Sequence, residues 1–312
     1  MTSCRFCGAE VSICIDGSPA LLRCRSCGLV FPERIPPPDV RRAGYEDRYY
    51  REGSGERFLP PLEGLIAGFL RLRVAGIRKR EPGPGSLLDV GCGRGNLLEM
   101  FQRRGWRVLG TQVSRTAAGA ARRRGVEVLR GELPEMELPP GTFDVVTFFH
   151  VLEHLDRPER YLRKAAELLR PGGLLVVEVP NFASPGFRIL GARNFCLDYP
   201  NHLVFFTPSS LRGLLVRSGF SIVGMSHFSL EYSPFTTLQN LLNLLPGEPS
   251  RLYRSLMGNE EGRRLRRSTL TWLHAALALM LAVPALALSA PGLLFPVGNT
   301  IRFYCRRRDP SM

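Results

Sequence analysis

Short apolar runs alternate with longer amphipathic stretches from residue 86 to about residue 228, and a last apolar run follows near residue 300. Runs of about four to eight apolar residues are typical of buried strands, whereas apolar residues spaced three or four apart are typical of helices. Their alternation predicts an α/β fold with an open, doubly wound sheet of seven strands. The predicted strands are Leu87–Val90, Trp106–Gly110, Val126–Arg130, Phe143–Phe149, Leu174–Val179, Phe220–Gly224 and Asn299–Cys305.

Amphipathic segments predict the helices. One begins at Asn96, a second spans Pro158–Leu169, and a third, Leu62–Ile77, precedes the sheet. Proline and glycine interrupt regular structure, so Arg170-Pro-Gly-Gly173 is predicted to be the turn that closes the second of these helices.

A glycine-rich turn joins the first predicted strand to the first helix. It reads Gly91-x-Gly93-x-Gly95, and glycines let the backbone turn sharply and bring its N–H groups close to a ligand. The dinucleotide fingerprint G-x-G-x-x-G would need glycine where the chain has Asn96. A plain structural turn and a nicotinamide site are the alternatives. With Asp89 two residues before the first glycine, the segment resembles the first motif of class I S-adenosylmethionine-dependent methyltransferases.

Later segments carry the same resemblance in the family's order. Gly131-Glu132 is similar to the Gly-Asp pair that meets the adenine amino group, and His150-Val-Leu-Glu-His154 follows the Phe-Asp strand as the fourth motif does. Gln112 stands where the family usually has an acidic residue for the ribose hydroxyls, and it lacks the charge that makes such contacts strong.

The resemblance covers about residues 86–228 and 298–307, and it implies a Rossmann-like sheet, S-adenosyl-L-methionine as cofactor, and methyl transfer. The residues that it implies for cofactor binding are Asp89, Gly91, Cys92, Gly93, Gly95, Gln112, Glu132, Leu133 and His150.

Two histidines are candidates for catalysis at the methyl acceptor. Transfer to oxygen requires loss of a hydroxyl proton, and histidine is the usual general base near neutral pH. His150 follows the fourth predicted strand, and His202 lies in a segment that resembles the family's His-Leu-x-x-Phe-Thr-Pro run. A hydrogen-bonded turn histidine is the alternative for His202, and activation by positioning alone is a further one. The spacing of His150 and His154 could also suit a metal, but Glu153 is not at the zincin position, so we expect His150 to line the cofactor cleft.

Four cysteines form two near-identical C-x-x-C-G units. Cys4, Cys7, Cys24 and Cys27 flank two predicted strands, Val11–Ile15 and Ala20–Arg23. Four thiolates suit a closed structural site for Zn²⁺, so we predict a small zinc ribbon. The metal could merely hold together a module too small to fold alone, which we favour, or support a recognition surface. Cys14 is out of register with both pairs and is expected to be a packed thiol. Because no apolar leader precedes the ribbon, a reducing cytoplasm is the simplest location.

The chain divides into four predicted parts. Residues 1–32 form the ribbon, and 33–85 hold a proline-rich linker, the aromatic segment Tyr45–Tyr50 and helices before the core. Residues 86–230 and 298–308 form the methyltransferase core, which is interrupted by a helical, partly apolar insertion at 231–297.

The insertion ends in an uncharged segment of 34 residues, from Ser268 to Ile301. Part of it is apolar enough to enter a bilayer, but Pro284, Pro291 and Pro296 favour a bend. The final strand must also return to the side of the core, and arginines flank both ends. We therefore expect a re-entrant hairpin or an interfacial pair of helices at the inner face of the membrane. A buried hairpin and a dimer interface are the alternatives.

Net charge adds little to this picture. The 42 basic and 28 acidic residues give +14, but only two of the basic residues are lysines, which is typical of coding bias in a GC-rich genome.

The predicted function is methyl transfer to a small-molecule or lipid-linked acceptor, with oxygen favoured as the methylated atom. A nucleic-acid-modifying or nucleic-acid-binding protein is one alternative, and the lack of aromatic residues among the basic runs speaks against it. A non-catalytic scaffold with a decayed cofactor site is the other. The sequence does not determine the acceptor or the oligomeric state.

Overall fold

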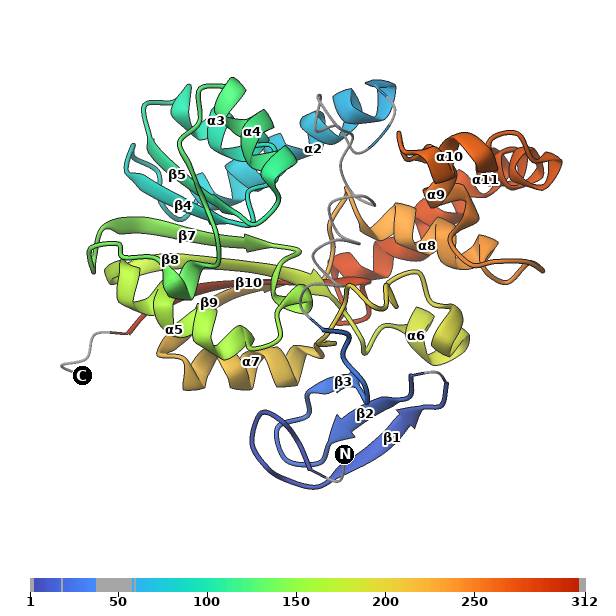
Figure 1. The fold of residues 1–312 in the computed structure, drawn as a ribbon, viewed down its shortest axis with the longest axis horizontal. Helices are drawn as coiled ribbons and strands as arrows, with labels where there is room; N and C mark the ends of the chain where they lie inside the picture. Colours follow the sequence, from blue (N-terminus) through green and yellow to red (C-terminus); the bar gives the residue numbers. More distant parts are fainter. Residues whose placement is uncertain (1–2, 18, 38–57, 59, 309–312) are drawn as a thin grey trace.

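The computed structural model describes residues 3–17, 19–37, 58 and 60–308 (Figure 1). Its centre is a seven-stranded sheet in the order β6-β5-β4-β7-β8-β10-β9, which confirms the predicted fold class. Every strand pair is parallel except those that β10 makes with β8 and β9. The strands are β4 (Ser86–Val90), β5 (Arg107–Gln112), β6 (Val128–Arg130), β7 (Phe143–Phe149), β8 (Leu169–Pro180), β9 (Phe220–Ser226) and β10 (Thr300–Arg307).

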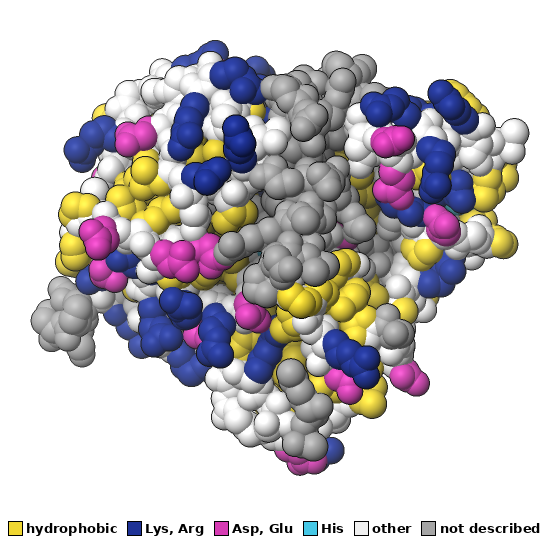
Figure 2. Space-filling view, viewed as in Figure 1, with side chains coloured by type: hydrophobic (Ala, Val, Ile, Leu, Met, Phe, Trp, Pro, Cys, Tyr) yellow, Lys and Arg dark blue, Asp and Glu magenta, His cyan; other side chains and the backbone are white. Residues whose placement is uncertain are grey.

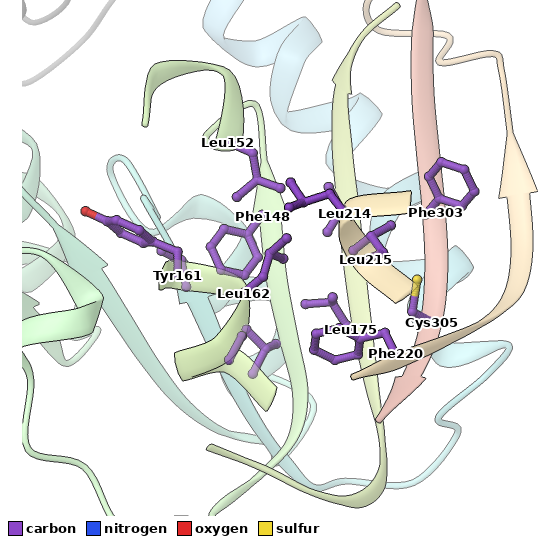
Figure 3. Packing of buried hydrophobic residues seen from close by; sticks show 14 of the residues in the cluster. Phe148, Leu152, Tyr161, Leu162, Leu175, Leu214, Leu215, Phe220, Phe303 and Cys305 are labelled. Carbon is purple, nitrogen blue, oxygen red and sulfur yellow. The ribbon is translucent and has the colours of Figure 1, made fainter. Parts of the chain in front are cut away.

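Helices cover both faces of the sheet because its central strands are apolar on both sides. On one face, α5 (Pro158–Leu168) and α7 (Pro208–Arg217) pack against Phe148 and Phe220, as Figure 3 shows. On the other face, α2 (Pro60–Arg78), α3 (Asn96–Gln102) and α4 (Arg115–Arg123) pack against Leu87 and Val145. The remaining short helices of the core are η1 (Leu133–Glu135), η2 (Leu152–His154), α6 (Pro185–Leu190) and η3 (Gly191–Arg193).

The predicted turn at Arg170–Gly173 is wrong, because these residues belong to strand β8. Pairing between β7 and β8 jumps from Phe143–Leu169 to Val145–Leu174, so the extra residues form a bulge within the strand. Gly172 adopts φ +70°, which glycine allows without a steric penalty.

The cysteine-rich module, residues 3–32, folds as an antiparallel sheet and docks on the core. Its strands are β1 (Val11–Ile15), β2 (Leu21–Cys24) and β3 (Val30–Pro32), of which β3 was not predicted. We call this module the cysteine ribbon. Val30 exchanges backbone hydrogen bonds with Phe205, with N–O distances of 3.3 and 2.8 Å. The ribbon is therefore attached directly to the segment that follows β8 and α6.

The insertion between β9 and β10 is helical, as predicted. It contains α8 (Ser233–Leu242), α9 (Arg251–Leu256), α10 (Glu260–Leu265), α11 (Thr269–Ser289) and η4 (Ala290–Leu293). α11 continues through Pro284 and ends at Ser289, and Pro291 and Pro296 lie beyond it. Neighbouring packing holds the helix: one side of α11 lies against α8, where Ala278 joins a cluster with Leu242.

The other side of α11 is apolar and exposed. Leu279 is 82% exposed, and Met280 and Val283 are each 75% exposed. Among the described residues, Thr269–Leu293 is the one helical segment long and apolar enough to cross a membrane. The predicted segment Tyr45–Tyr50 lies outside the described residues.

Candidate active site

The glycine-rich turn between β4 and α3 has the backbone conformation that requires glycine. Gly91, Gly93 and Gly95 adopt φ of +68°, +54° and +74°, in the left-handed region that side chains disfavour. A Cβ atom at Gly91 would also lie 2.6 Å from Val151 Cγ2, on the loop after β7. The turn thus exposes main chain at the carboxyl end of β4, where ligands bind in sheets of this kind.

Asp89 is a buried carboxyl immediately before the turn. Its side chain accepts a hydrogen bond of 2.6 Å from Thr147 Oγ1. Burial raises the pKa of Asp89 to about 6, more than the Thr147 hydroxyl and Arg73 lower it. Keeping an ionised carboxylate at this place costs folding free energy, which indicates a functional reason for it.

A cavity of about 700 Å³ opens at the glycine-rich turn. Of the residues predicted to bind the cofactor, five line this cavity: Asp89, Gly91, Cys92, Gly93 and His150. The turn and the fourth-motif segment are therefore brought together, as the resemblance implied.

The other predicted cofactor residues lie outside the lining of this cavity. Gln112 is buried at the end of β5, and its Oε1 accepts a hydrogen bond of 3.1 Å from the Ser114 backbone N–H. Glu132 Oε2 accepts one of 3.0 Å from Tyr161 Oη, and Leu133 is fully buried. Gly95 is the N-cap of α3. Gln112 ends β5, the neighbour of β4, and Glu132 follows β6, one strand further out. Their contacts with the cofactor stay predictions.

His150 is held between two buried carboxylates. Its Nδ1 lies 3.2 Å from Glu153 Oε1, and its Nε2 lies 3.2 Å from Glu178 Oε1. Burial lowers the pKa of His150, but the hydrogen bonds and charges of Glu153 and Glu178 outweigh it and raise the pKa to about 9. The ring is therefore protonated near pH 7, with both nitrogens engaged. This geometry suits a residue that positions carboxylates, and a general base needs an unprotonated nitrogen.

The sequence interpretation missed a charged network behind His150. Glu178 lies 3.2 Å from Arg73 on α2 and also pairs with Arg302 on β10, while Arg73 lies 3.0 Å from Glu231. Burial raises the pKa of Glu178, but Arg302, Arg73 and His150 outweigh it and hold the value far below the ordinary one. The available signal was a single glutamate within the apolar strand Leu174–Val179.

Glu153, His154 and His202 form a second cluster in the same cavity. Their potential ligand atoms all lie within 4.8 Å of one another, and the two imidazole rings are 4.8 Å apart between centroids. His154 Nδ1 lies 3.0 Å from the Asn201 carbonyl oxygen, and His202 Nδ1 lies 2.8 Å from that of Cys196. The structure thus brings His154 together with His202, and Glu153 links this cluster to His150.

Much of the remaining cavity wall is apolar and aromatic, and Glu231, Arg254 and Glu261 also line it. Its wall comes from α2 and from the helices of the insertion, so the cavity lies between the sheet and the inserted segment. The apolar residues that line it include Leu65, Phe69, Leu70, Phe195, Phe235, Leu238, Tyr253, Leu256 and Met257. Such a wall suits an apolar acceptor with few polar groups.

The four cysteine thiols converge in the ribbon. Cys4 Sγ lies 3.8 Å from Cys27 Sγ, and Cys7 Sγ lies 3.5 Å from Cys24 Sγ. A tetrahedral zinc ion with bonds of about 2.3 Å separates its sulfur ligands by about 3.8 Å, so the spacing fits this metal. Cys14 is not in the cluster, and its thiol lies 3.4 Å from the Leu21 carbonyl oxygen.

Comparisons with known proteins show the family of the chain. A model of the methyltransferase domain family matches residues 63–224. The ubiquinone biosynthesis O-methyltransferase of Azoarcus sp. (strain BH72) is 32% identical over 168 residues, which are 50% of this chain and 71% of that protein. A probable S-adenosylmethionine-dependent methyltransferase of Mycobacterium tuberculosis (strain ATCC 25618 / H37Rv) is 33% identical over 55% of this chain and 62% of that protein.

A solved structure shows the same fold. It is the 1,6-didemethyltoxoflavin-N1-methyltransferase of Burkholderia thailandensis with bound S-adenosylhomocysteine, which has a TM-score of 0.50 and 17% identity and covers 96% of this chain and 100% of that one. The enzyme class predicted from the motifs is confirmed: the chain belongs to the class I S-adenosylmethionine-dependent methyltransferases.

Proposed function

We propose that the enzyme transfers the methyl group of S-adenosylmethionine to a hydroxyl group of a small, apolar acceptor. The observation that carries this proposal is the single cavity that joins the glycine-rich turn to Glu153, His154 and His202 along an aromatic wall. The similarity to proteins named as O-methyltransferases supports oxygen as the methylated atom.

We infer that one end of the cavity binds the cofactor and the other end binds the acceptor. When the cofactor is bound, it supplies an electrophilic methyl group on a sulfonium. Methyl transfer would break the S–CH₃ bond with its electron pair left on sulfur and form the O–CH₃ bond, and the hydroxyl proton would pass to water. The turn around Gly91 and Gly93 positions the cofactor, and the acceptor hydroxyl lies beside His154 and His202. Of the two histidines predicted to be catalytic, His202 fits work at the acceptor better because His150 is protonated.

The cofactor site needs its own test, independent of the acceptor. Calorimetric titration with S-adenosylhomocysteine should show micromolar binding, and Gly93→Val should abolish it because a branched side chain disfavours φ +54°. Gly247→Val is the matched control, since Gly247 also has positive φ but lies in the insertion and not in the cavity lining.

The acceptor class is tested with labelled cofactor and paired acceptors. We expect methylation of phenols that carry alkyl tails, with KM falling as the tail lengthens within the apolar cavity. Anilines of the same shape should react poorly. Methylation of the anilines in preference to the phenols would contradict transfer to oxygen.

We also propose that the cysteine ribbon holds one structural Zn²⁺. All four thiols are used, which leaves no open position for catalysis. Backbone N–H groups lie 3.4 Å from Cys4 Sγ and Cys24 Sγ, where they stabilise thiolate charge. Elemental analysis should find one zinc ion fewer per chain in Cys7→Ser than in the wild type.

We further propose that α11 contacts the cytoplasmic face of a membrane, from which a lipid-linked or otherwise apolar acceptor enters the cavity. The exposed apolar side of α11 supports this, and Ala282 of this helix lines the cavity. Arginines of α10 lie exposed beside it, and Figure 2 shows basic and hydrophobic side chains next to each other at this end of the insertion. Basic residues next to an apolar helix face favour anionic lipid.

Vesicle flotation tests the membrane contact. Wild-type protein should float with vesicles that contain anionic lipid, and Leu279→Asp with Met280→Asp should stay at the bottom. Val223→Asp is the control, because Val223 on β9 is a similarly exposed apolar side chain, at 52% exposure, far from α11 in the fold. Equal flotation of all variants would contradict this role for α11.

A further inference from the structure

We propose that Glu153, His154 and His202 bind a divalent transition-metal ion in the wall of the acceptor cavity. Two histidines and one carboxylate form the ligand set of many zinc, iron and manganese sites that keep positions open for substrate. This site is separate from the cysteine ribbon, whose thiols form a closed set. The role of the ion in catalysis rests on the proposed function, whereas its binding does not.

The carboxylate of Glu153 is the first observation that points to a cation. Its Oε1 is occupied by His150, at 3.2 Å. Its Oε2 is buried and has no hydrogen-bond partner among the described residues, and the side chain is only 2% exposed. A buried carboxylate oxygen without a partner is costly, so its retention needs a reason, and a cation in contact with Oε2 supplies one.

The orientation of the two imidazoles is the second observation. Carbonyl oxygens only accept hydrogen bonds, so the contacts of His154 with Asn201 and of His202 with Cys196 place a proton on each Nδ1. Each Nε2 is then the nitrogen with a lone pair. Metal-binding histidines are usually held in this way, with the other ring nitrogen donating to a carbonyl or carboxylate.

The third observation is that the backbone fixes the position of the ligands relative to one another. Leu203 and Val204, next to His202, donate backbone hydrogen bonds of 2.6 and 3.1 Å to the Glu153 carbonyl oxygen. Main-chain hydrogen bonds therefore hold together two segments that are far apart in sequence. The potential ligand atoms of the three residues all lie within 4.8 Å of one another.

Position in the cavity gives the ion a chemical role. All three residues line the space that also contains Gly91 and Gly93, so an ion here has protein on one side and the acceptor on the other. An acceptor hydroxyl bound next to the ion would have a lower pKa, because the positive charge stabilises the deprotonated oxygen. Its proton leaves to water as the methyl group is transferred, which replaces a general base at this end of the cavity.

Metal stoichiometry tests the proposal without relying on turnover. Full-length protein is dialysed against Zn²⁺, freed of loose metal and analysed by atomic emission. A second sample, prepared with one zinc per chain so that only the ribbon is filled, is titrated with Mn²⁺ and followed by electron paramagnetic resonance. We expect two zinc ions per wild-type chain and at least a tenfold loss of Mn²⁺ affinity in Glu153→Gln and in His202→Asn. Each variant should retain the zinc of the ribbon. Glu167→Gln, an exposed glutamate that pairs with Lys164, is the matched control and should bind as wild type.

Cofactor binding in the same samples separates the outcomes. S-adenosylhomocysteine affinity should be unchanged in His202→Asn, which shows that the fold and the cofactor site are intact. One zinc per wild-type chain together with no Mn²⁺ signal would overturn the proposal, as would a second ion that survives both substitutions. A second ion that binds as expected, in an enzyme that methylates anilines and not phenols, would leave the metal site standing and refute the proposed acceptor chemistry.

Discussion

Replacing Asp89 with asparagine should stabilise the cofactor-free enzyme near neutral pH. Burial raises the pKa of Asp89 from 3.8 to about 6, so the folded protein holds this proton more tightly than the unfolded chain does. Above both values the ionised carboxylate opposes folding, by about 3 kcal/mol for a difference of this size. Asparagine has the same shape, carries no charge and can still accept the Thr147 hydroxyl. We expect the Asp89→Asn variant to gain about 2 to 3 kcal/mol of unfolding free energy at pH 7.5.

The sign of the pH dependence is part of this prediction. For a group whose pKa is raised on folding, stability is full below the unfolded value and is lost as the pH rises through about 6. The difference between the variant and the wild type should therefore approach zero near pH 4 and grow through pH 6. Urea unfolding at fixed zinc concentration, without cofactor, measures it at each pH.

Asp144 offers a matched control, because its replacement should change the unfolding free energy in the opposite direction. Arg170 Nε lies 2.5 Å from Asp144 Oδ1 and outweighs burial, so that the pKa of Asp144 is lowered. Asp144→Asn should lose stability at pH 7.5. An Asp89→Asn variant that is no more stable than wild type, or whose advantage does not change with pH, would refute the reasoning about buried charge.

Three further outcomes follow from other parts of the structure. Gly91→Ala should weaken S-adenosylhomocysteine binding at least tenfold. Adding Val151→Ala relieves the steric clash, but it should restore only part of the affinity, because the backbone cost of about 1 to 2 kcal/mol at positive φ remains. Full recovery of the affinity would show that the positive φ of Gly91 does not matter for binding. Arg5→Ala removes a hydrogen bond of 2.6 Å to the Leu203 carbonyl oxygen, and calorimetry should show a lower melting temperature at unchanged zinc content. Removal of zinc with a chelator should make the ribbon sensitive to protease while the core stays intact, and equal resistance with and without chelator would argue against a structural metal.

Local patterns were sufficient to predict the core of the fold and the cofactor turn. The periodicity of each strand is set by burial on both faces, and the turn at Gly91 depends on backbone angles that the local sequence itself imposes. The bulge at Arg170–Gly173 was missed because glycine and proline signal an interruption without showing whether the strand resumes. Packing against α8 also supports the continuation of α11 through Pro284, where local preference alone would end a helix.

The candidate site was harder to predict because its parts meet only in three dimensions. The sequence placed His150 at the cofactor cleft, but it did not show that Glu153 and Glu178 hold the ring from both sides. His154 meets His202, which is brought to it by main-chain bonds to Glu153. No spacing rule within one segment contains this information.

The place of β10 in the sheet has a consequence for the order in which the enzyme folds during synthesis. Among the described residues β9 pairs only with β10, so it has no strand partner until β10 has been made, after the whole insertion. Arg302, which pairs with Glu178 behind the active site, arrives at the same late moment. In the interval the whole insertion, with its apolar α11, has already been made, while the sheet is incomplete. Such non-local closure is slow, and an unpaired strand beside an exposed apolar helix is prone to aggregate. Early association of α11 with a surface would shield the chain through this stage, and a truncation before β10 should leave a protein that neither closes its sheet nor remains in solution.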